Sequence, residues 1–483
     1  MKKRFKILYI VIFMLISLLP MLLFPFVKEN AQIEKRTLAA FPSYIEDGHL
    51  NRNFGDQFEA WFNDHIPLRA YLLSAANRIQ GEWLHAQSSN VIVGKQGWLF
   101  FNSEKADYLD ANALTDHQVR AAAVTLSLIQ ENIESRGGHF LFVPAPNKSS
   151  VYGEYMPAGY QQGDENNLDR ISVRLGEYGV KFADLKGLFL NNKEPVIYHR
   201  RDSHWNYRGA LLAFHEIMSG LEHDHESLLD AAYTVKKDWR GDLDKLLYPA
   251  GGTLDDQYYY QIEHDDFRFI HPMTMHDAKT QLAIYMSDKE EKDDLFTTRN
   301  SNRKDGSTLY MVRDSFGRAL LPYMIDAYEN ATFKRTDSPD LVSLKDGTDL
   351  IYEIAERNLA RIIAKAPFMY APERDDEYEY PDKAAGTGDA QVHVDTASYG
   401  VQIYGALPED ADTGDGRVYI SLRGAEGSRV WEAFPIYEEK LLGKAGEKGF
   451  SMYLPKEALP SGQYAITVIT GNVRYDGGMA NIK

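Results

Sequence analysis

The chain has 483 residues, of which 44% are hydrophobic and 25% charged, and it contains no cysteine. A chain of this length is usually too long to fold around a single hydrophobic core, which indicates two or three domains. The missing cysteines exclude disulfides, thiol nucleophiles and cysteine-bound metals. The formal net charge of −17 argues against a nucleic-acid partner, because phosphate binding needs a basic surface.

The N-terminus is predicted to enter a membrane. Residues 7–27 (ILYIVIFMLISLLPMLLFPFV) carry no charge, and at about 1.5 Å per residue they span the hydrocarbon core. The basic stretch at residues 2–6 should stay in the cytoplasm and place the bulk of the chain outside. A cleaved signal peptide is the alternative, although its apolar run is usually shorter. Both interpretations export the rest of the chain, and we expect a single-pass cell-membrane protein.

The next segment is predicted to be partly helical and to lead into a hairpin. Phe54, Phe58, Trp61 and Phe62 have the spacing of one helix face. Residues 91–101 (VIVGKQGWLFF) combine a β-branched start, a Gln-Gly turn and an aromatic end, which is typical of a β-hairpin.

Helices and apolar strands then alternate, which indicates an α/β sheet. A helix is expected after Thr115, because Gln118 completes a capping-box pattern and Gly137 follows the last apolar position. The further expected elements are a strand at 139–147, a strand at 179–185, a helix at 206–221, a strand–turn–helix at 307–328 and a strand at 348–359.

The C-terminal part of the chain has a different sequence pattern. Residues 371–390 are acidic, contain Pro and Gly and lack an apolar period, as linkers do. Short strand-like runs broken by Gly, Asp and Pro follow and predict a β-sandwich. The expected division is a tail and transmembrane anchor (1–28), a helical lead-in (29–88), an α/β domain (89–370), the linker (371–390) and a β-sandwich (391–483).

Asp202, His204 and Ser315 are the candidate catalytic residues. A serine hydroxyl becomes a useful nucleophile when a base removes its proton and a third group orients that base. Ser315 falls between a strand-like and a helix-like stretch, a turn at which a serine is exposed and a helix N-terminus can stabilise an oxyanion. His204 would be the base. Asp202, two positions earlier, would accept from its other ring nitrogen.

Each of these signals is also compatible with a plainer interpretation. An Asp-x-His pair occurs in ordinary loops and in metal sites. A metal would need a further ligand, such as His199 or the His-Asp-His run at 223–225. The adjacent Arg200 and Arg201 would place positive charge beside the ion, which disfavours a metal site.

Several motifs together resemble the SGNH-hydrolase-like family of cell-surface polysaccharide O-acetyltransferases, the AlgJ/AlgX-like and Gram-positive DHHW-type proteins. The resemblance covers about residues 30–365, and it is specific because the motifs recur in one order. They are EKRTLAAFP (34–42), FNDHIPLR (62–69), VIVGKQGWLFF (91–101), PAPNKSSVYGEYMP (144–157), RRDSHWNYRGA (200–210), VRDSFGRALLPYM (312–324) and IYEIAERNL (351–359).

The family implies an SGNH-like three-layer α/β/α domain and a Ser–His–Asp triad, carried here by Ser315, His204 and Asp202. Arg313 stands where many SGNH enzymes have a glycine, so the oxyanion hole is not a direct carry-over; the Ser315 backbone N–H is the expected donor. Four further residues have implied roles. Asn147 would be a second oxyanion donor. Lys148 and Arg357 would hold the sugar or position the triad, with salt bridges at the sheet edge as the plainer alternative. Trp205 would pack against His204 or stack on a sugar, with a place in the core as the alternative.

The resemblance implies a membrane-anchored O-acetyltransferase. It would accept acetyl from a membrane-bound O-acyltransferase onto Ser315 and pass it to a polysaccharide hydroxyl, with neither cofactor nor metal. An esterase that uses the same triad with water as acceptor is one alternative. A non-catalytic glycan-binding surface protein is the other, and would not depend on Ser315. The β-sandwich is a candidate carbohydrate-binding unit.

Overall fold

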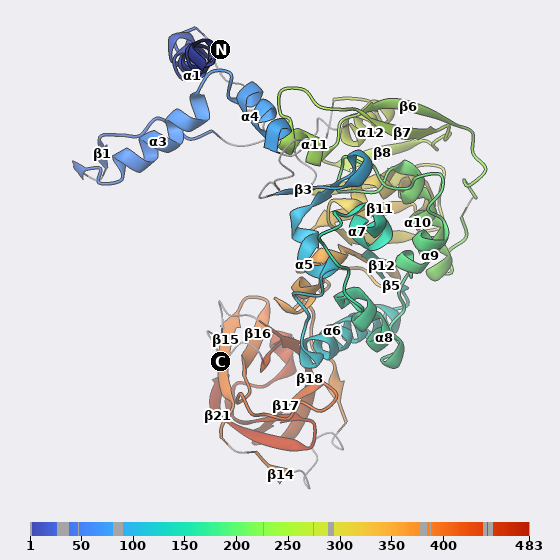
Figure 1. Cartoon of the computed structure of the whole chain (residues 1–483). Helices are drawn as coiled ribbons and strands as arrows, with labels where there is room; N and C mark the ends of the chain where they lie inside the picture. The colour runs from blue at the N-terminus through green and yellow to red at the C-terminus, as the bar shows by residue number, and fades with distance from the viewer. Residues whose placement is uncertain are drawn as a thin grey trace.

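The computed structural model describes residues 2–26, 38–46, 48–80, 90–225, 227–273, 275–287, 294–375, 384–386, 388–437, 442 and 448–482. Figure 1 shows an N-terminal helix with a short helical extension, a mixed α/β body and a β-rich C-terminal part. The predicted α/β fold class is confirmed.

The N-terminal part is helical. Helix α1 (Lys2–Leu23) contains a stretch, Arg4–Leu23, with a mean hydropathy of 2.4, long and apolar enough to cross a membrane. The last predicted membrane residue, Val27, lies outside the described residues. After the short strands β1 (Ile45–Glu46) and β2 (His49–Leu50) come α3 (Phe54–His65) and α4 (Arg69–Arg78). Helix α3 contains the four aromatic residues expected on one helix face.

The body is built on a six-stranded sheet in the order β5-β12-β10-β11-β9-β8. The first four strands run parallel, and the last two are antiparallel additions at one edge. Their bounds are β5 (Phe140–Ala145), β12 (Thr348–Ala355), β10 (Thr308–Arg313), β11 (Asn330–Arg335), β9 (Leu295–Asn300) and β8 (Phe267–His271). All residues of β5 and β12 are buried, as in a sheet covered on both faces.

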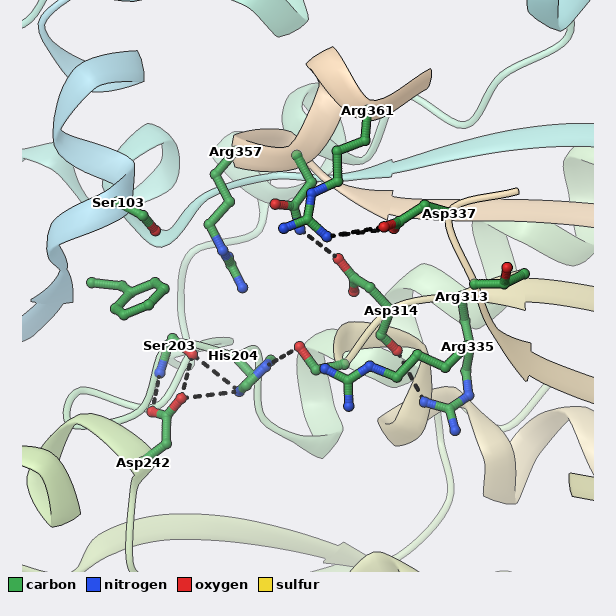
Figure 2. Close-up of a pocket in the computed structure, with 14 residues that line it drawn as sticks. Ser103, Ser203, His204, Asp242, Arg313, Asp314, Arg335, Asp337, Arg357 and Arg361 are labelled. Atoms are coloured by element: carbon green, nitrogen blue, oxygen red, sulfur yellow. Dashed lines mark hydrogen bonds and ion pairs between the residues drawn. The ribbon is translucent and has the colours of Figure 1, made fainter. Parts of the chain in front are cut away.

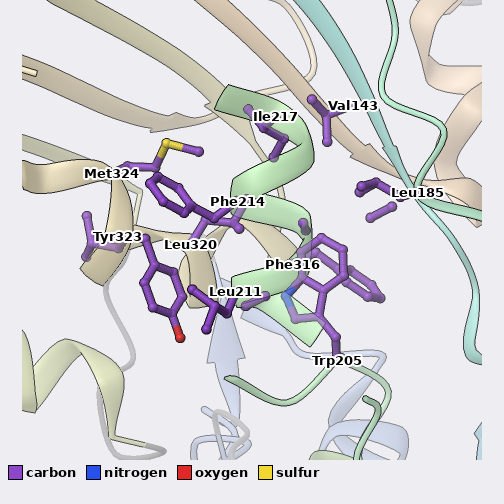
Figure 3. Packing of buried hydrophobic residues seen from close by; sticks show 14 of the residues in the cluster. Val143, Leu185, Trp205, Leu211, Phe214, Ile217, Phe316, Leu320, Tyr323 and Met324 are labelled. Carbon is purple, nitrogen blue, oxygen red and sulfur yellow. The ribbon is translucent and has the colours of Figure 1, made fainter. Parts of the chain in front are cut away.

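Helices cover both faces of this sheet, so the body has the predicted three layers. Along β5, Phe140 and Phe142 join one hydrophobic cluster while Leu141 and Val143 join the other, because alternate strand residues point to opposite faces. Figure 3 shows part of the cluster that contains Val143, packed around α10. One face carries α6 (Asp116–Ser135), α8 (Asn167–Glu177) and η6 (Glu356–Ile363), and the other α9 (Leu185–Asn191), α10 (Tyr207–Gly220) and α13 (Leu321–Ala327).

Local sequence signals account for most of these elements. The predicted capping box is present: Thr115 accepts from the Gln118 N–H, and the Gln118 side chain accepts from the Thr115 N–H. The strand predicted at 179–185 is wrong. Only Phe182 pairs, in a single bridge with Phe142 at the free edge of β5, because Asp184 already caps helix α9.

Smaller elements surround the carboxyl edge of the parallel strands. The predicted hairpin forms from β3 and β4, and a second hairpin forms from β6 and β7. Their bounds, with those of the short helices, are β3 (Val91–Val93), η2 (Lys95–Gly97), β4 (Leu99–Phe101), η3 (Asn102–Glu104), α5 (Lys105–Tyr108), α7 (Lys148–Val151), η4 (Gly153–Tyr155), β6 (Tyr233–Trp239), α11 (Asp242–Leu247), β7 (Asp255–Tyr260), α12 (Ala278–Met286) and η5 (Phe316–Leu320).

The C-terminal part is antiparallel except where β14 pairs with β21. Strand β18 pairs with β17 along most of its length and with β19 at its end, so it links two halves that share one hydrophobic cluster. The strands are β13 (Glu373–Arg374), β14 (Ala384–Ala385), β15 (Gln391–Ala397), β16 (Gly400–Ala406), β17 (Val418–Gly424), β18 (Gly427–Ile436), β19 (Gly449–Leu454), β20 (Gly462–Thr470) and β21 (Val473–Ile482), with the turn η9 (Lys456–Ala458). Strands β13 and β14 come from the segment expected to be a linker.

This sheet packs directly on α6. Phe434 and Ile436 at the end of β18 belong to the same hydrophobic cluster as α6. Beside them, Arg374 donates to both carboxylate oxygens of Glu131 on α6, each at 2.6 Å, and to the buried Glu432. The contact is therefore both apolar and charged.

Candidate active site

Loops that follow the parallel strands supply most of the candidate residues. Asn147 and Lys148 follow β5, Ser315 follows β10, and Arg357 follows β12. Because these strands are parallel neighbours, their carboxyl ends meet at one edge, where open α/β sheets usually bind ligands. Asp202 and His204 reach the same edge from the loop that precedes α10.

The structure brings Asp202, His204 and Ser315 into one hydrogen-bonded chain. The His204 Nδ1 lies 2.7 Å from Asp202 Oδ1, and the His204 Nε2 lies 2.8 Å from Ser315 Oγ. An ionised carboxylate only accepts hydrogen bonds. The Nδ1 therefore carries the proton, and the Nε2 lone pair accepts from the serine hydroxyl. This tautomer prepares His204 to remove the Ser315 proton.

The Asp202 carboxylate is held by four hydrogen bonds. Oδ1 accepts from the backbone N–H and the ring of His204. Oδ2 accepts from the Trp239 indole N–H and the Asp242 backbone N–H, each at 3.0 Å. Burial alone would raise the pKa of Asp202, but the hydrogen bond and charge of His204 outweigh it and hold the pKa well below its usual range. The carboxylate stays ionised and fixed in orientation.

A second carboxylate, Asp242, stands behind the histidine and was not found from the sequence. Its Oδ2 lies 3.8 Å from His204 Nδ1, and it accepts from the Ser203 N–H and hydroxyl. Burial would lower the pKa of His204, but the hydrogen bond to Asp202 and the charges of Asp202 and Asp242 raise it. Asp242 is a second source of the raised pKa.

The loop that carries Asp202 is fastened by Lys148. This side chain is fully buried, and its Nζ donates to the backbone carbonyls of His199, Arg200 and Asp202. Burial lowers the pKa of Lys148 to about 8, against the opposing charge of Glu104, so the ammonium form prevails at neutral pH. Lys148 is expected from the sequence either to hold the sugar or to position the triad. These contacts are those of a positioning residue.

The turn that carries Ser315 is shaped by another buried acid, Glu353 on β12. Its Oε2 accepts from the N–H groups of Asp314 and Gly317. A Cβ on Gly317 would lie 2.8 Å from that oxygen, so the close approach requires a glycine. The Ser315 N–H itself has no hydrogen-bond acceptor among the described residues, which leaves it available to an incoming oxygen.

A cavity of about 580 Å³ opens beside His204 and Ser315. Figure 2 shows Asp242 and Ser203 on one side of His204 and a group of arginines around the rest of the cavity. Arg357 places its guanidinium 5.2 Å from the Phe316 ring centre, and its buried Nη1 has no hydrogen-bond partner within the described ranges. The other lining residues are Phe101, Ser103, Arg313, Asp314, Arg335, Thr336, Asp337, Asn358 and Arg361.

Two predicted substrate contacts lie outside this cavity. Asn147 is fully buried and its Nδ2 donates to Asp107 at 3.1 Å, so the amide expected at the oxyanion is directed into the interior. Trp205 is 2% exposed and packs edge-on against Phe316, because apolar residues of α10 and η5 enclose it (Figure 3). Its ring faces are covered, as in the core alternative.

The residues offered as metal ligands do not converge. His199 stacks on Trp239, and His225 pairs with His215 at 2.9 Å. Within the described ranges, the group of three acidic and histidine side chains whose ligand atoms all lie within 4.8 Å of one another is Asp202, His204 and Asp242. The four hydrogen bonds to Asp202 already occupy one member of that group.

Comparison with known proteins agrees with the predicted resemblance. Residues 91–282 match the family model described as SGNH hydrolase-like domain, acetyltransferase AlgX. A probable alginate O-acetylase AlgJ of Pseudomonas aeruginosa is 22% identical over 177 residues, which are 36% of this chain and 44% of that protein. The match therefore spans less than half of the relative.

Solved structures resemble part of the chain. A DHHW family protein from Eubacterium siraeum is 18% identical, with a TM-score of 0.41, and the match covers 56% of this chain and 95% of that one. The O-acetyltransferase domain of Pseudomonas putida AlgJ is 14% identical, with a TM-score of 0.36 and coverages of 56% and 92%.

Replacing Asp242 by Asn should lower the pKa of His204, because it removes one of the two negative charges that raise it. The titration can be followed by NMR of the His204 ring protons, assigned with His204→Gln. Asp337→Asn, which neutralises a carboxylate in the same cavity away from His204, is the control. An unchanged His204 pKa in Asp242→Asn would show that Asp202 alone sets it.

Replacing Lys148 by Met should destabilise the body, because the buried carbonyls of His199 and Asp202 lose their donor at a cost of about 1–3 kcal/mol each before relaxation. The midpoint of thermal unfolding should fall by several degrees. Lys95→Met, which removes a lysine bonded to one exposed carbonyl, is the matched control and should change the midpoint little. Equal midpoints for the two variants would contradict the fastening role.

Proposed function

We propose, from the match of residues 91–282 to the AlgX-type SGNH hydrolase-like acetyltransferase family, that this chain is a serine O-acetyltransferase of the cell envelope. The observation that carries the proposal is the chain of short hydrogen bonds from Asp202 through His204 to Ser315, beside a cavity. An acyl-transfer site needs this arrangement of nucleophile, base and orienting acid.

In the first half-reaction, Ser315 Oγ attacks the carbonyl carbon of an acetyl donor while His204 Nε2 takes the hydroxyl proton. The charge on the carbonyl oxygen is stabilised by the Ser315 N–H and by the positive charge of Arg357. His204 returns its proton to the leaving group, and the acetyl group remains on Ser315. Asp202 keeps the imidazolium oriented throughout.

In the second half-reaction, a hydroxyl of a polysaccharide enters the cavity. His204 removes its proton, the resulting oxygen attacks the acetyl carbon, and Ser315 recovers its hydroxyl. Because His204 must be neutral to act as a base and its pKa is raised, the rate should increase as the pH rises through that pKa.

The N-terminal helix supports a further part of the proposal, that the enzyme is held at the membrane with its bulk outside the cytoplasm. A single-pass anchor would keep the site beside a membrane-bound O-acyltransferase that supplies acetyl. The division of the chain into anchor, α/β domain and C-terminal domain is proposed with it. Carbohydrate binding by residues 391–483 stays a prediction.

Replacing Ser315 by Ala should abolish transfer from a chromogenic acetyl ester to an oligosaccharide, with a loss of about 10³-fold or more. Acetylated sugar is measured by mass spectrometry with the full chain in detergent. Ser103→Ala, which removes another serine of the same cavity, should retain activity.

Two results would redirect the proposal. Acetate release that depends on Ser315 but yields no acetylated sugar with any acceptor would identify the esterase alternative. Equal activity of the wild type and Ser315→Ala would remove Ser315 from the reaction.

A further inference from the structure

Helix α3 carries an aromatic face that none of the hydrophobic cores among the described residues covers. Phe54, Phe58, Trp61 and Phe62 stand at helical spacing, and their rings contact one another. No residue of α3 is buried. None of the four belongs to the hydrophobic clusters of the body or the C-terminal sheet.

Rings from the preceding segment extend this aromatic face. Tyr44 stacks on Phe54 at 4.3 Å between ring centres, and Phe41 lies edge-on to Trp61 at 4.9 Å. The added rings remain open to solvent, since Phe41 is 53% exposed and Tyr44 is 64% exposed. The nearby Leu50 is 82% exposed. Aromatic residues in this number and exposure are uncommon on a soluble surface without a binding role.

The aromatic face of α3 lies at the point where the apolar helix ends. Phe24, one residue beyond the candidate span Arg4–Leu23, contacts Trp61 and stacks on Phe62 at 5.9 Å. In Figure 1, α1 is viewed along its axis while α3 runs across the page. If α1 crosses a bilayer, α3 therefore lies along the bilayer surface, at the depth where Trp, Tyr and Phe concentrate.

We propose that α3, with Phe41 and Tyr44, is a membrane-interface helix whose aromatic face inserts into the outer leaflet. The inference rests on the membrane anchoring proposed above. A helix with one apolar face and one polar face lies in the interfacial plane. The opposite face of α3 supplies the polar side, with exposed Asp56, Glu59 and Asn63.

The charge of α3 determines which lipids it fits. Helices that bind anionic lipid through charge are rich in Lys and Arg, whereas the polar face of α3 carries Asp56 and Glu59. Insertion therefore depends on apolar and aromatic burial. It should occur in phosphatidylcholine alone and should resist salt, because a screened Coulomb attraction is not what holds it.

The helix that follows α3 in the chain is bonded to the part of the body that carries Asp242. On this helix, α4, Asn77 donates to the Leu247 carbonyl at 2.8 Å, and Ser74 accepts from the Ala250 N–H at 3.1 Å. Leu247 ends helix α11, and that helix begins at Asp242 beside His204. Seating α3 on the membrane would therefore bring α4, and through it α11 and the cavity, close to the bilayer surface.

The test uses the absence of native cysteine. Single substitutions Phe58→Cys and Asn63→Cys, on opposite faces of α3, are labelled with an environment-sensitive fluorophore in the full chain. The protein is reconstituted into phosphatidylcholine vesicles with and without nitroxide-labelled phosphatidylcholine. A third site, Leu15→Cys in the middle of α1, reports whether the anchor is in the bilayer.

We expect lipid nitroxide to quench the probes at positions 15 and 58, and position 58 several-fold more strongly than position 63, at low and high salt alike. Quenching at 15 without quenching at 58 overturns the interface helix but leaves the anchor intact. Equal quenching at 58 and 63 overturns the assigned face. A lack of quenching at 15 overturns the anchoring itself, and with it this inference.

Discussion

A single buried ammonium group holds in place the loop that carries Asp202 and His204. Lys148 leaves the carboxyl end of β5 and ties down the three carbonyls of residues 199, 200 and 202. Without it, the carbonyls of residues 199 and 202 would lose their donor in the interior, which is costly, while that of residue 200 would keep the Leu99 N–H. The orientation of Asp202, and through it the tautomer of His204, depends on that attachment. The buried lysine therefore connects strand β5 of the sheet to the loop that carries Asp202 and His204.

The sheet provides a second constraint, because it brings together residues far apart in sequence. Ser315 and Arg357 follow adjacent parallel strands, so pairing of β10 with β12 sets the distance between nucleophile and cation. Glu353, on β12, then binds the turn after β10 through two N–H groups. The nucleophile is thus held by both its own strand and the neighbouring one, which suits a site that must be preorganised.

Much of this arrangement could be predicted from local patterns. The capping box at Thr115, the helix expected at 206–221 and the buried strands each follow from short-range rules, and ordered motifs named Asp202, His204 and Ser315 as candidates. Contacts between distant segments could not be predicted. In the sequence, Asp242 looks like an ordinary acidic residue at the start of a helix. No sequence pattern shows that it lies behind His204. The motif position of Asn147 likewise does not reveal that its amide donates to Asp107.

If acetyl passes through Ser315, the acylated enzyme can be trapped during turnover. Full-length protein is mixed with an acetyl-ester donor, quenched in acid within a turnover and mapped by peptide mass spectrometry. The account predicts one acetyl group on the peptide that contains Ser315, which disappears when an acceptor oligosaccharide is added before the quench. Acetylated sugar formed without any acetyl on Ser315, or with acetyl on another residue, would contradict it.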